Sequence, residues 1–211
     1  MALPDELAGE REDGRRLDLA VYAAIAATPT PRLDDLFRRV SAAADRSRLW
    51  IATAALVAAV GGGPGRRAAA DGLASVGLAS AIANLVLKPL GGRRRPNRDT
   101  NHVPVARQVP MPETTSFPSG HAASAFAFAS GASFALPAVG FPLNLAAAVV
   151  AYSRVHTGVH YPGDVVAGAV AGAALAPIAV AARRDLARRT AARARSRRRD
   201  RSHRPRRRSS P

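Results

Sequence analysis

Residues 165–182 read VVAGAVAGAALAPIAVAA, a run of 18 residues without a charged side chain. A helix needs about 20 mostly apolar residues to cross a hydrocarbon core of about 30 Å. Residues 68–87 form a second stretch of about that length, interrupted only by Asp71 and Asn84. Both stretches are apolar on every face, whereas a helix of a soluble bundle carries a polar stripe. They therefore predict membrane-spanning helices rather than a soluble alanine-rich bundle.

Shorter apolar segments lie before and between these two stretches. Residues 49–60 are apolar, and residues 122–151 break at Pro137, which predicts two helices joined by a tight turn. Residues 33–48 place apolar side chains at helical spacing, which predicts an amphipathic helix. Residues 17–28 are apolar but too short for a predicted span. The fold class that follows is all-α, a polytopic membrane helical bundle with about five to six membrane-associated helices.

The positive charge of the chain is concentrated at its C-terminal end. Residues 183–211 contain 14 arginines and two aspartates, and so carry +12 of the formal net charge of +16. We predict three regions: a polar N-terminal segment (1–16), a membrane domain (17–182) and a disordered, Arg-rich cytoplasmic tail (183–211). The tail has no interleaved aromatic residues for base stacking, so its expected partner is anionic lipid headgroups rather than nucleic acid.

The arginines also predict how the chain is oriented in the membrane. Arg66 and Arg67 precede the apolar stretch 68–87, and the basic tail follows the last one. Short basic flanks of membrane helices stay in the cytoplasm. Both clusters then place Lys88 and the loop 89–120 on the extracytoplasmic side. We expect an integral protein of the cell membrane with an extracytoplasmic site.

Three polar blocks fall at that same predicted end. They read KPLGGRRRP (88–96), FPSGH (117–121) and YSRVHTGVHYPGD (152–164). Alone, each has a structural explanation, because Ser119 and Asp164 could simply cap helices. Together they supply what phosphate chemistry needs, namely cations for the oxygens, free backbone N–H groups at a glycine-led helix start, and two histidines. The chain has no cysteine and no carboxylate cluster, which favours nucleophile and acid over a metal site.

These blocks resemble the three-part signature of the type-2 phosphatidic acid phosphatases, also called lipid phosphate phosphatases. That signature is Lys, six residues, Arg-Pro; then Pro-Ser-Gly-His; then Ser-Arg, five residues, His, three residues, Asp. The matching positions are Lys88 with Arg95 and Pro96, Pro118 to His121, and Ser153, Arg154, His160 and Asp164. The resemblance covers roughly residues 48–182. It implies hydrolysis of a lipid phosphate, of the phosphatidic acid or polyprenyl phosphate or diphosphate type, without metal or other cofactor.

The resemblance also implies a role for each residue. His160 is expected to be the nucleophile that forms a phosphohistidine, Asp164 to orient it, and His121 to protonate the leaving group. The phosphoryl oxygens are expected to bind Lys88, Arg95, Ser119, Gly120 and Arg154. The two histidines need opposite protonation states, so we expect their environments to separate their pKa values.

Other residues and one other class of protein compete with this interpretation. His156 rivals His160 as nucleophile, but only His160 has an arginine six residues before it and an aspartate four after it, so His156 is expected in a loop near the headgroup. Neighbouring arginines are expected to steer the substrate: Arg93, Arg94, Arg98 and Arg107. The rival class is a membrane-anchored binder of anionic lipid or nucleic acid. Such a binder would lose its main activity on deletion of residues 185–211, whereas an enzyme would keep turnover.

Overall fold

The computed structural model describes residues 5–202, and within them the chain is helical with no strand. The helices, in chain order, are α1 (Asp5–Ala27), α2 (Pro31–Ala43), α3 (Arg48–Val60), α4 (Gly62–Ile82), α5 (Lys88–Gly91), α6 (Gly120–Ser133), α7 (Gly140–His156) and α8 (Pro162–Ser202). A π-helical segment, η2 (Ala83–Leu87), joins α4 to α5. The short 3-10 turns are η1 (Asp45–Ser47), η3 (Val105–Arg107) and η4 (Pro137–Val139). The predicted all-α class is confirmed, as is the turn at Pro137 between two helices.

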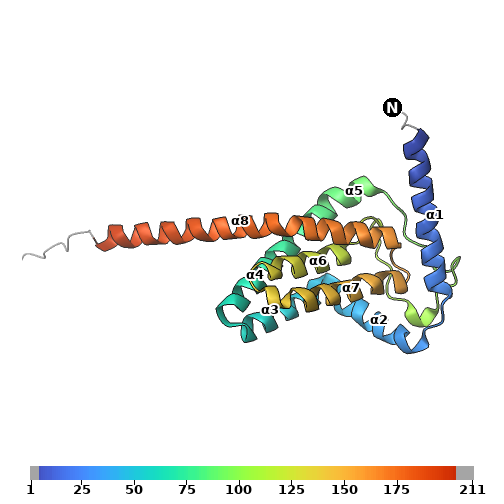
Figure 1. Cartoon of the computed structure of the whole chain (residues 1–211), viewed down its shortest axis with the longest axis horizontal. Coiled ribbons are helices and arrows are strands. Elements are labelled where there is room, and N and C mark those ends of the chain that lie inside the picture. The colour runs from blue at the N-terminus through green and yellow to red at the C-terminus, as the bar shows by residue number, and fades with distance from the viewer. Residues whose placement is uncertain (1–4, 203–211) are drawn as a thin grey trace, which may run out of the picture.

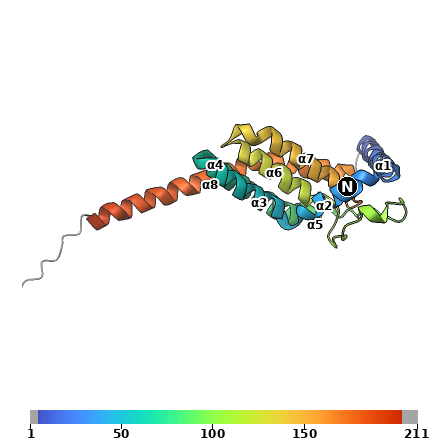
Figure 2. The ribbon, with the colours of Figure 1, turned by 90° about the horizontal axis from the view of Figure 1, so that it is seen from below.

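Helix α6 lies at the centre of the bundle. It packs against α4, α7 and α8, and α3 packs against α4 (Figures 1 and 2). Nine of the 14 residues of α6 are buried, and all of them except Phe128 are alanine, serine or glycine. Small side chains let helix backbones approach closely, which allows tight packing of short helices in a membrane.

The crossing of α6 and α8 depends on two glycines. A Cβ atom on Gly172 would lie 2.1 Å from the carbonyl oxygen of Ala123, and one on Gly168 would lie 2.4 Å from that of Ser119. Neither position has room for a side chain, because the obstacle is backbone rather than a movable side chain. The two helices therefore touch backbone to backbone along this line.

The outside of the bundle is apolar. The side chains that are more than half exposed there include Ile51, Leu56, Val60, Leu85, Phe141, Leu145, Val166, Val170 and Ile178. An apolar outer surface of this kind is suited to contact with lipid hydrocarbon chains. The backbone N–H and C=O groups of a helix are hydrogen-bonded within the helix, so they need no water in the membrane interior. Among the residues described, three helical segments are long and apolar enough to cross a membrane: Gly62–Gly91, Pro137–His156 and Pro162–Ser196. The prediction of a polytopic membrane bundle is confirmed.

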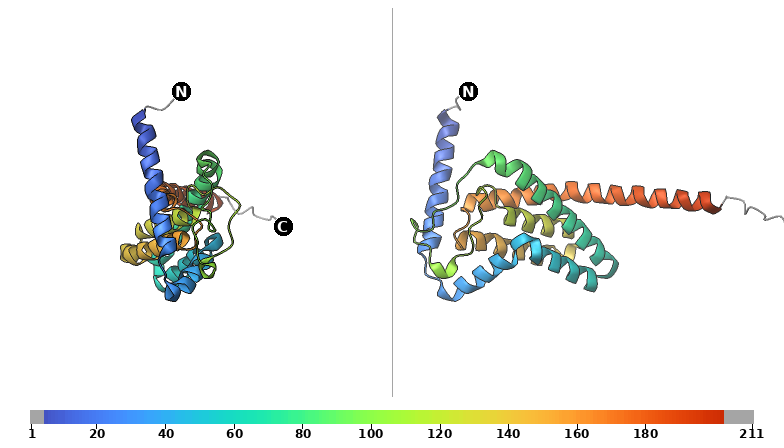
Figure 3. Two further views of the ribbon diagram at one scale, coloured as in Figure 1. Left: turned by 90° about the vertical axis from the view of Figure 1, so that its right-hand side faces the viewer. Right: turned by 180° about the vertical axis from the view of Figure 1, so that it is seen from behind.

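The N-terminal helix does not run with the bundle. Helix α1 lies crosswise at the end where α8 begins, and α2 leads from it back to the bundle (Figures 1 and 3). Because α1 begins at Asp5, most of the predicted polar segment is helical and continuous with residues 17–27. Its buried Tyr22 packs edge-on against Tyr161, with ring centroids 5.4 Å apart, which fixes α1 against the start of α8.

The prediction of a disordered tail from residue 183 is wrong for the residues described. Helix α8 continues through Ser202, far beyond the bundle (Figure 1). Alanine and arginine both favour helix. In addition, Arg183 and Arg184 lie 2.5 and 2.6 Å from the two oxygens of the buried Asp71 carboxylate, so the first turns past the apolar run are held by ion pairs to α4. Residues 203–211 of the predicted tail lie outside the described residues.

Replacing the glycine at the α6–α8 crossing should destabilise the fold. In Gly172→Ala the added Cβ meets the Ala123 carbonyl, so the helices must separate, at a cost of about 1–3 kcal/mol. Thermal unfolding in detergent, followed by the fluorescence of the single, buried Trp50, should show a lower midpoint. Gly77→Ala on α4 is the matched control, because nothing lies within 4 Å of its Cβ position. Equal midpoints for the two variants would contradict the packing argument.

Candidate active site

Buried polar side chains gather at one end of the bundle, where α6 and α8 begin and α7 ends. They include Asp18, Asp34, Arg107, Ser116, Ser119, Arg154, His156, Thr157, His160 and Asp164. The three polar blocks of the sequence contribute α5, the start of α6 and the α7–α8 connection to this end. Burying so many polar groups is costly unless each has partners. Their mutual contacts therefore define the site.

His160 and Asp164 form a buried pair. Nδ1 of His160 lies 3.5 Å from Oδ2 of Asp164, and both side chains are almost completely enclosed. The carboxylate also accepts hydrogen bonds from the Ser116 hydroxyl, from the Tyr161 backbone N–H at 2.9 Å and from Arg93 at 2.9 Å. A carboxylate held from three sides can fix the orientation of the imidazole. The other ring nitrogen, Nε2, is thereby left for a reacting group.

Arg95 stands beside that free nitrogen. Its NH1 lies 3.3 Å from Nε2 of His160 and donates to the carbonyl of Val159 at 3.0 Å. The rest of the guanidinium donates to the loop before α6, with Nε 2.8 Å from the Thr114 carbonyl oxygen. The motif residues Arg95, His160 and Asp164 are thus brought together, as predicted for a site that acts on an anion.

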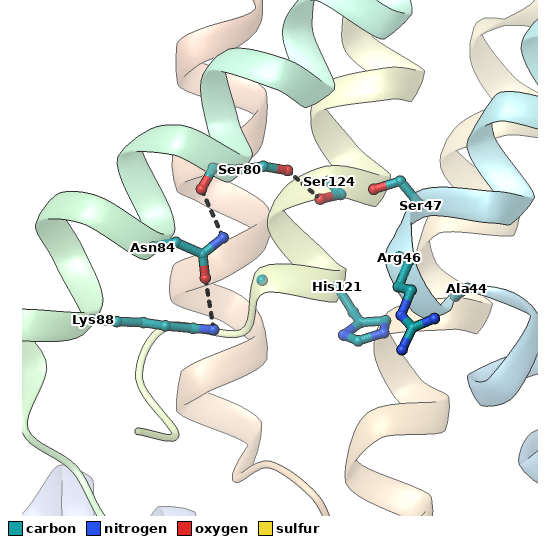
Figure 4. A pocket seen from close by; sticks show the side chains of 9 residues that line it. Ala44, Arg46, Ser47, Ser80, Asn84, Lys88, His121 and Ser124 are labelled. Carbon is teal, nitrogen blue, oxygen red and sulfur yellow. Dashed lines mark hydrogen bonds between the residues drawn. The ribbon is translucent and has the colours of Figure 1, made fainter. Parts of the chain in front are cut away.

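Lys88, Gly120 and His121 line a cavity of about 190 Å³. Figure 4 shows the Lys88 amino group and the His121 ring reaching into this region from opposite sides, with Arg46 beside the ring. The amino group is held by Asn84 Oδ1 at 2.9 Å. Gly120 begins α6, and the Lys88 amino group lies 3.9 Å from its Cβ position. Positive charge beside the backbone N–H groups of a helix N-terminus suits an anion.

Ser119 has a structural role in addition to its predicted one. Its hydroxyl accepts the Ala122 N–H at 3.4 Å and so caps α6, and its own N–H donates to the Asp164 carbonyl at 2.9 Å. The start of α6 is therefore bonded directly to the start of α8. Phosphate binding by the Ser119 hydroxyl stays a prediction.

Arg154 is buried next to the site but turns toward α2. Its NH1 donates to the Ser41 hydroxyl and lies 3.9 Å from Asp45. Together with His121 it lines a second cavity of about 650 Å³, apart from the cavity of Lys88. The structure thus brings Arg154 to Ser41 and Asp45 rather than to the cavity of Lys88, and phosphate binding by Arg154 stays a prediction.

Asp45 is a site residue that the sequence analysis missed. Its Oδ1 lies 2.9 Å from Nε2 of His121, so each of the two motif histidines has its own carboxylate. The contact joins residues 76 positions apart, and residues 33–48 were predicted to be one amphipathic helix. The available signal was the polar Asp-Arg-Ser run, where Arg46 and Ser47 adopt left-handed backbone angles (φ 53° and 59°) and break that helix.

His156 is not the loop residue that the sequence suggested. It ends α7, is buried, and its Nε2 lies 3.0 Å from Oδ1 of Asp34. The same oxygen accepts from Arg107 at 2.9 Å. Arg107 is buried as well and donates to the carbonyls of Ile25 and Thr28. This cluster ties α1, α2 and the loop before α6 to α7, so Arg107 holds the fold rather than steering a substrate.

Two of the other arginines expected to steer the substrate, Arg93 and Arg98, also have partners in the fold. Arg93 bridges Asp164 and Asp18, with distances of 2.9 and 2.6 Å, and lies over the ring of Tyr161. Arg98 donates to the Val109 carbonyl at 2.8 Å. Arg94 is exposed, and substrate steering by it stays a prediction.

The electrostatic environment favours neutral imidazoles. Burial lowers the pKa of His160 to about 4, against the opposing hydrogen bond of Asp164. Burial and the charge of Arg154 lower the pKa of His121 to about 4, against the opposing effect of Asp45. Burial thus lowers the pKa of both imidazoles, and the expected separation of their pKa values in the working enzyme stays a prediction. A neutral His160 keeps the lone pair that a nucleophile needs.

The helices and this site define a polytopic helical membrane protein with a histidine- and arginine-lined site at one end of its bundle. Residues 68–188 match the family model described as the PAP2 superfamily, and the chain belongs to that superfamily. Among the residues described, no group of three or more His, Asp or Glu side chains could hold a metal ion. The predicted lack of a metal requirement stays a prediction.

Two curated relatives are in keeping with the family assignment. The chain is 41% identical over 103 residues to decaprenylphosphoryl-5-phosphoribose phosphatase of Mycobacterium tuberculosis (48% of this chain, 53% of the relative), and 35% identical over 105 residues to lipid A 4'-phosphatase of Bacteroides thetaiotaomicron (46% of each). It therefore spans about half the length of these curated relatives.

The solved structures that resemble this chain share its fold. Aquifex aeolicus LpxE superposes with a TM-score of 0.63 at 24% identity, covering 78% of this chain and 94% of that one. A transmembrane PAP2 type phosphatidylglycerolphosphate phosphatase from Bacillus subtilis superposes with a TM-score of 0.62 at 21% identity, covering 82% and 87%.

The protonation states of the two histidines can be measured. Because burial disfavours the imidazolium, His160 and His121 should both be neutral at pH 6 and titrate near pH 4 in histidine-labelled protein followed by NMR. In Asp45→Asn the His121 midpoint should fall further, because the carboxylate that raises its pKa is gone, while that of His160 should stay. Two imidazolium signals at pH 6 would contradict this description of the site.

Proposed function

We propose that this chain is an integral membrane lipid phosphate phosphatase that works through a phosphohistidine intermediate. The observation that carries the proposal is the buried His160–Asp164 pair, with Arg95 at its free nitrogen. The phosphatase names of the two curated relatives support it. The proposed substrate is a phosphomonoester or diphosphate of a lipid, since the site opens at one end of an apolar bundle.

The chemistry follows from the positions of the side chains. Nε2 of His160 attacks phosphorus once the Arg95 guanidinium turns from this nitrogen to a phosphoryl oxygen. The other oxygens bind Lys88 and the N–H groups at the start of α6, where the developing negative charge is stabilised. The bond between phosphorus and the ester oxygen breaks, and His121 gives that oxygen a proton. Water, activated by the now neutral His121, then attacks the phosphohistidine and releases inorganic phosphate.

His121 must be protonated to act first as an acid, although burial keeps it neutral in the free chain. A bound phosphate adds negative charge beside it and so raises its pKa. Asp45 acts in the same direction, and its contact at Nε2 leaves Nδ1 for the leaving group. Asp45 is therefore proposed as a positioning residue for the acid, as Asp164 is for the nucleophile.

The orientation in the membrane is also a proposal. Arg66 and Arg67 lie in the first two turns of α4, which begins at Gly62, and the Arg-rich part of α8 leaves the bundle at the same end, opposite the histidines (Figure 3). Basic flanks of this kind stay in the cytoplasm. The site then faces the extracytoplasmic leaflet of the cell membrane, while the basic end of α8 contacts anionic headgroups of the cytoplasmic leaflet. Turnover does not require that end, because it lies far from the site.

Loss of the proposed nucleophile should abolish phosphate release. Purified protein should hydrolyse phosphatidic acid or a prenyl phosphate with EDTA present, and His160→Ala should reduce turnover at least about 10³-fold. The matched control is His102→Asn, a change at an exposed loop histidine whose positive φ asparagine tolerates. Inactivation by EDTA, or full activity in His160→Ala, would refute the proposal.

The orientation can be tested with single cysteines, because the chain has none. Thr100 lies exposed in the loop at the histidine end, and Ser196 lies exposed on the far part of α8. On intact cells a membrane-impermeant maleimide should label Thr100→Cys and leave Ser196→Cys unlabelled until the cells are opened. The reverse pattern would mean that the site faces the cytoplasm.

A further inference from the structure

Helix α1 brings a carboxylate to the neighbourhood of the proposed nucleophile. This helix precedes residues 68–188, the part of the chain that matches the family model, and carries none of the motif residues. It crosses the end of the bundle at which α8 begins (Figures 1 and 3). Its Asp18 is buried against the first turn of α8. The proposed mechanism gives Asp18 no role.

The two oxygens of Asp18 have different partners. Oδ1 accepts the backbone N–H of Gly163 at 2.6 Å, and Oδ2 lies 2.6 Å from NH2 of Arg93. Gly163 is in the first turn of α8, where backbone N–H groups have no partner within the helix. A Cβ atom on Gly163 would lie 3.0 Å from Oδ2 of Asp18, so the carboxylate fills the space beside this turn. Asp18 therefore binds the start of α8 and an arginine at the same time.

Arg93 extends this contact to Asp164. Its NH1 lies 2.9 Å from Oδ1 of Asp164, and among the residues that the structure describes it is the only partner of that oxygen. The other oxygen, Oδ2, accepts from the Ser116 hydroxyl and the Tyr161 N–H and faces His160. A carboxylate is fixed against rotation when both of its oxygens are held. Arg93 thus completes the fixation of the group that orients His160.

Arg93 itself is oriented by α1. Its guanidinium carbon lies 4.1 Å from the centre of the Tyr161 ring, and that ring packs against Tyr22 of α1. A planar guanidinium presents its N–H groups in a rigid fork, so it can serve two carboxylates through separate nitrogens only in a defined orientation. Asp18 at one nitrogen and the ring beside the guanidinium set this orientation.

Attachment of α1 does not by itself explain the charges. Tyr22 already packs against the start of α8, and Arg107 donates to the Ile25 carbonyl of α1 at 3.0 Å. A buried ion pair is a costly means of attachment, because both charges lose their hydration. The charges of Asp18 and Arg93 are accounted for if they act on Asp164.

We propose that Asp18 and Arg93 are positioning residues for the nucleophile. Asp18 holds Arg93, Arg93 fixes the Asp164 carboxylate, and Asp164 orients the His160 ring. Neither Asp18 nor Arg93 touches the substrate. Helix α1 is then a working part of the active site, although it lies outside the residues that match the family model. This inference rests on the proposed function and adds two residues to it.

A double-mutant cycle tests whether Asp18 acts through Arg93. Asp18→Asn removes the charge but keeps an acceptor for the Gly163 N–H, and Arg93→Gln removes the guanidinium. Each variant should lower kcat about 10–100-fold, because a misplaced imidazole loses rate. KM should change less than about twofold, because substrate binding is not affected. Adding Asp18→Asn to Arg93→Gln should cause no further loss. Losses that multiply in the double variant would overturn the inference.

The titration of His160, followed by NMR, is a readout that a purely structural role would not move in this way. Asp18→Asn removes a negative charge and should lower the pKa of His160, whereas Arg93→Gln removes a positive charge and should raise it. Both variants leave unchanged the other ionisable groups that act on this imidazole, which are Asp164, Arg95, Arg154 and His121. Shifts of the same sign, or no shift, would overturn the inference.

Asp13→Asn is the matched control. It removes the same charge from an exposed position of the same helix and should leave both kcat and the His160 midpoint as in the wild type. A fall in kcat equal to that of Asp18→Asn would overturn the inference. If Arg93→Gln does not fold, as judged by Trp50 fluorescence, the His160 titration in Asp18→Asn decides alone.

The outcomes separate this inference from the function beneath it. If the wild type releases phosphate from neither phosphatidic acid nor a prenyl phosphate, the proposed function fails and the positioning role fails with it. If the wild type is active and Asp18→Asn is equally active, only the positioning role is refuted. A higher KM with unchanged kcat in Arg93→Gln would mean that Arg93 binds the substrate, which would also overturn the inference.

Discussion

The backbone contact between α6 and α8 is the constraint on which the site depends. Gly168 lets α8 approach the carbonyl of Ser119, and the N–H of Ser119 donates to the carbonyl of Asp164. These contacts join the first turn of α6 to the first turn of α8. As a result His121, on one helix, and Asp164, on the other, are held in a fixed relation by backbone rather than by flexible side chains. A site assembled in this way is pre-organised before any ligand arrives.

Buried carboxylates in turn form the ion pairs that attach the peripheral segments of the chain to the bundle. Asp34 binds both Arg107 and His156, Asp18 binds Arg93, and Asp71 binds the two arginines of α8. Each carboxylate is largely buried and each partner comes from a distant part of the chain. Breaking such a pair leaves an uncompensated buried charge, which is strongly destabilising. The crosswise α1 and the long loop before α6 are therefore fixed by ion pairs, where a soluble domain of this size would rely on a larger apolar core.

The sequence sufficed for features that depend on local composition. Apolar length identified two of the three spans and missed Pro137–His156. Pro137 marked the turn between α6 and α7, and the spacing of Lys88, Arg95, His121 and His160 indicated the site. It did not suffice for pairs that form only when distant segments meet. Asp45 reaches His121 because the chain breaks after α2, and His156 is buried because α1 and α2 fold back over α7. The tail prediction failed for the same reason, since a charge-rich run is helical here once Asp71 on another helix anchors its first turns.

Helix α8 also sets a length scale for the whole molecule. It runs without interruption from Asp164 to the arginine pair at 183 and 184, a rise of about 28 Å at about 1.5 Å per residue. A bilayer hydrocarbon core is about 30 Å thick. When the arginine pair sits at the headgroups of one leaflet, the histidines at the other end of this rod must sit at the headgroups of the opposite leaflet. The length of this helix therefore sets the depth of the histidines in the membrane. In a thinner or thicker bilayer the histidines would lie at a different depth relative to the lipid phosphates.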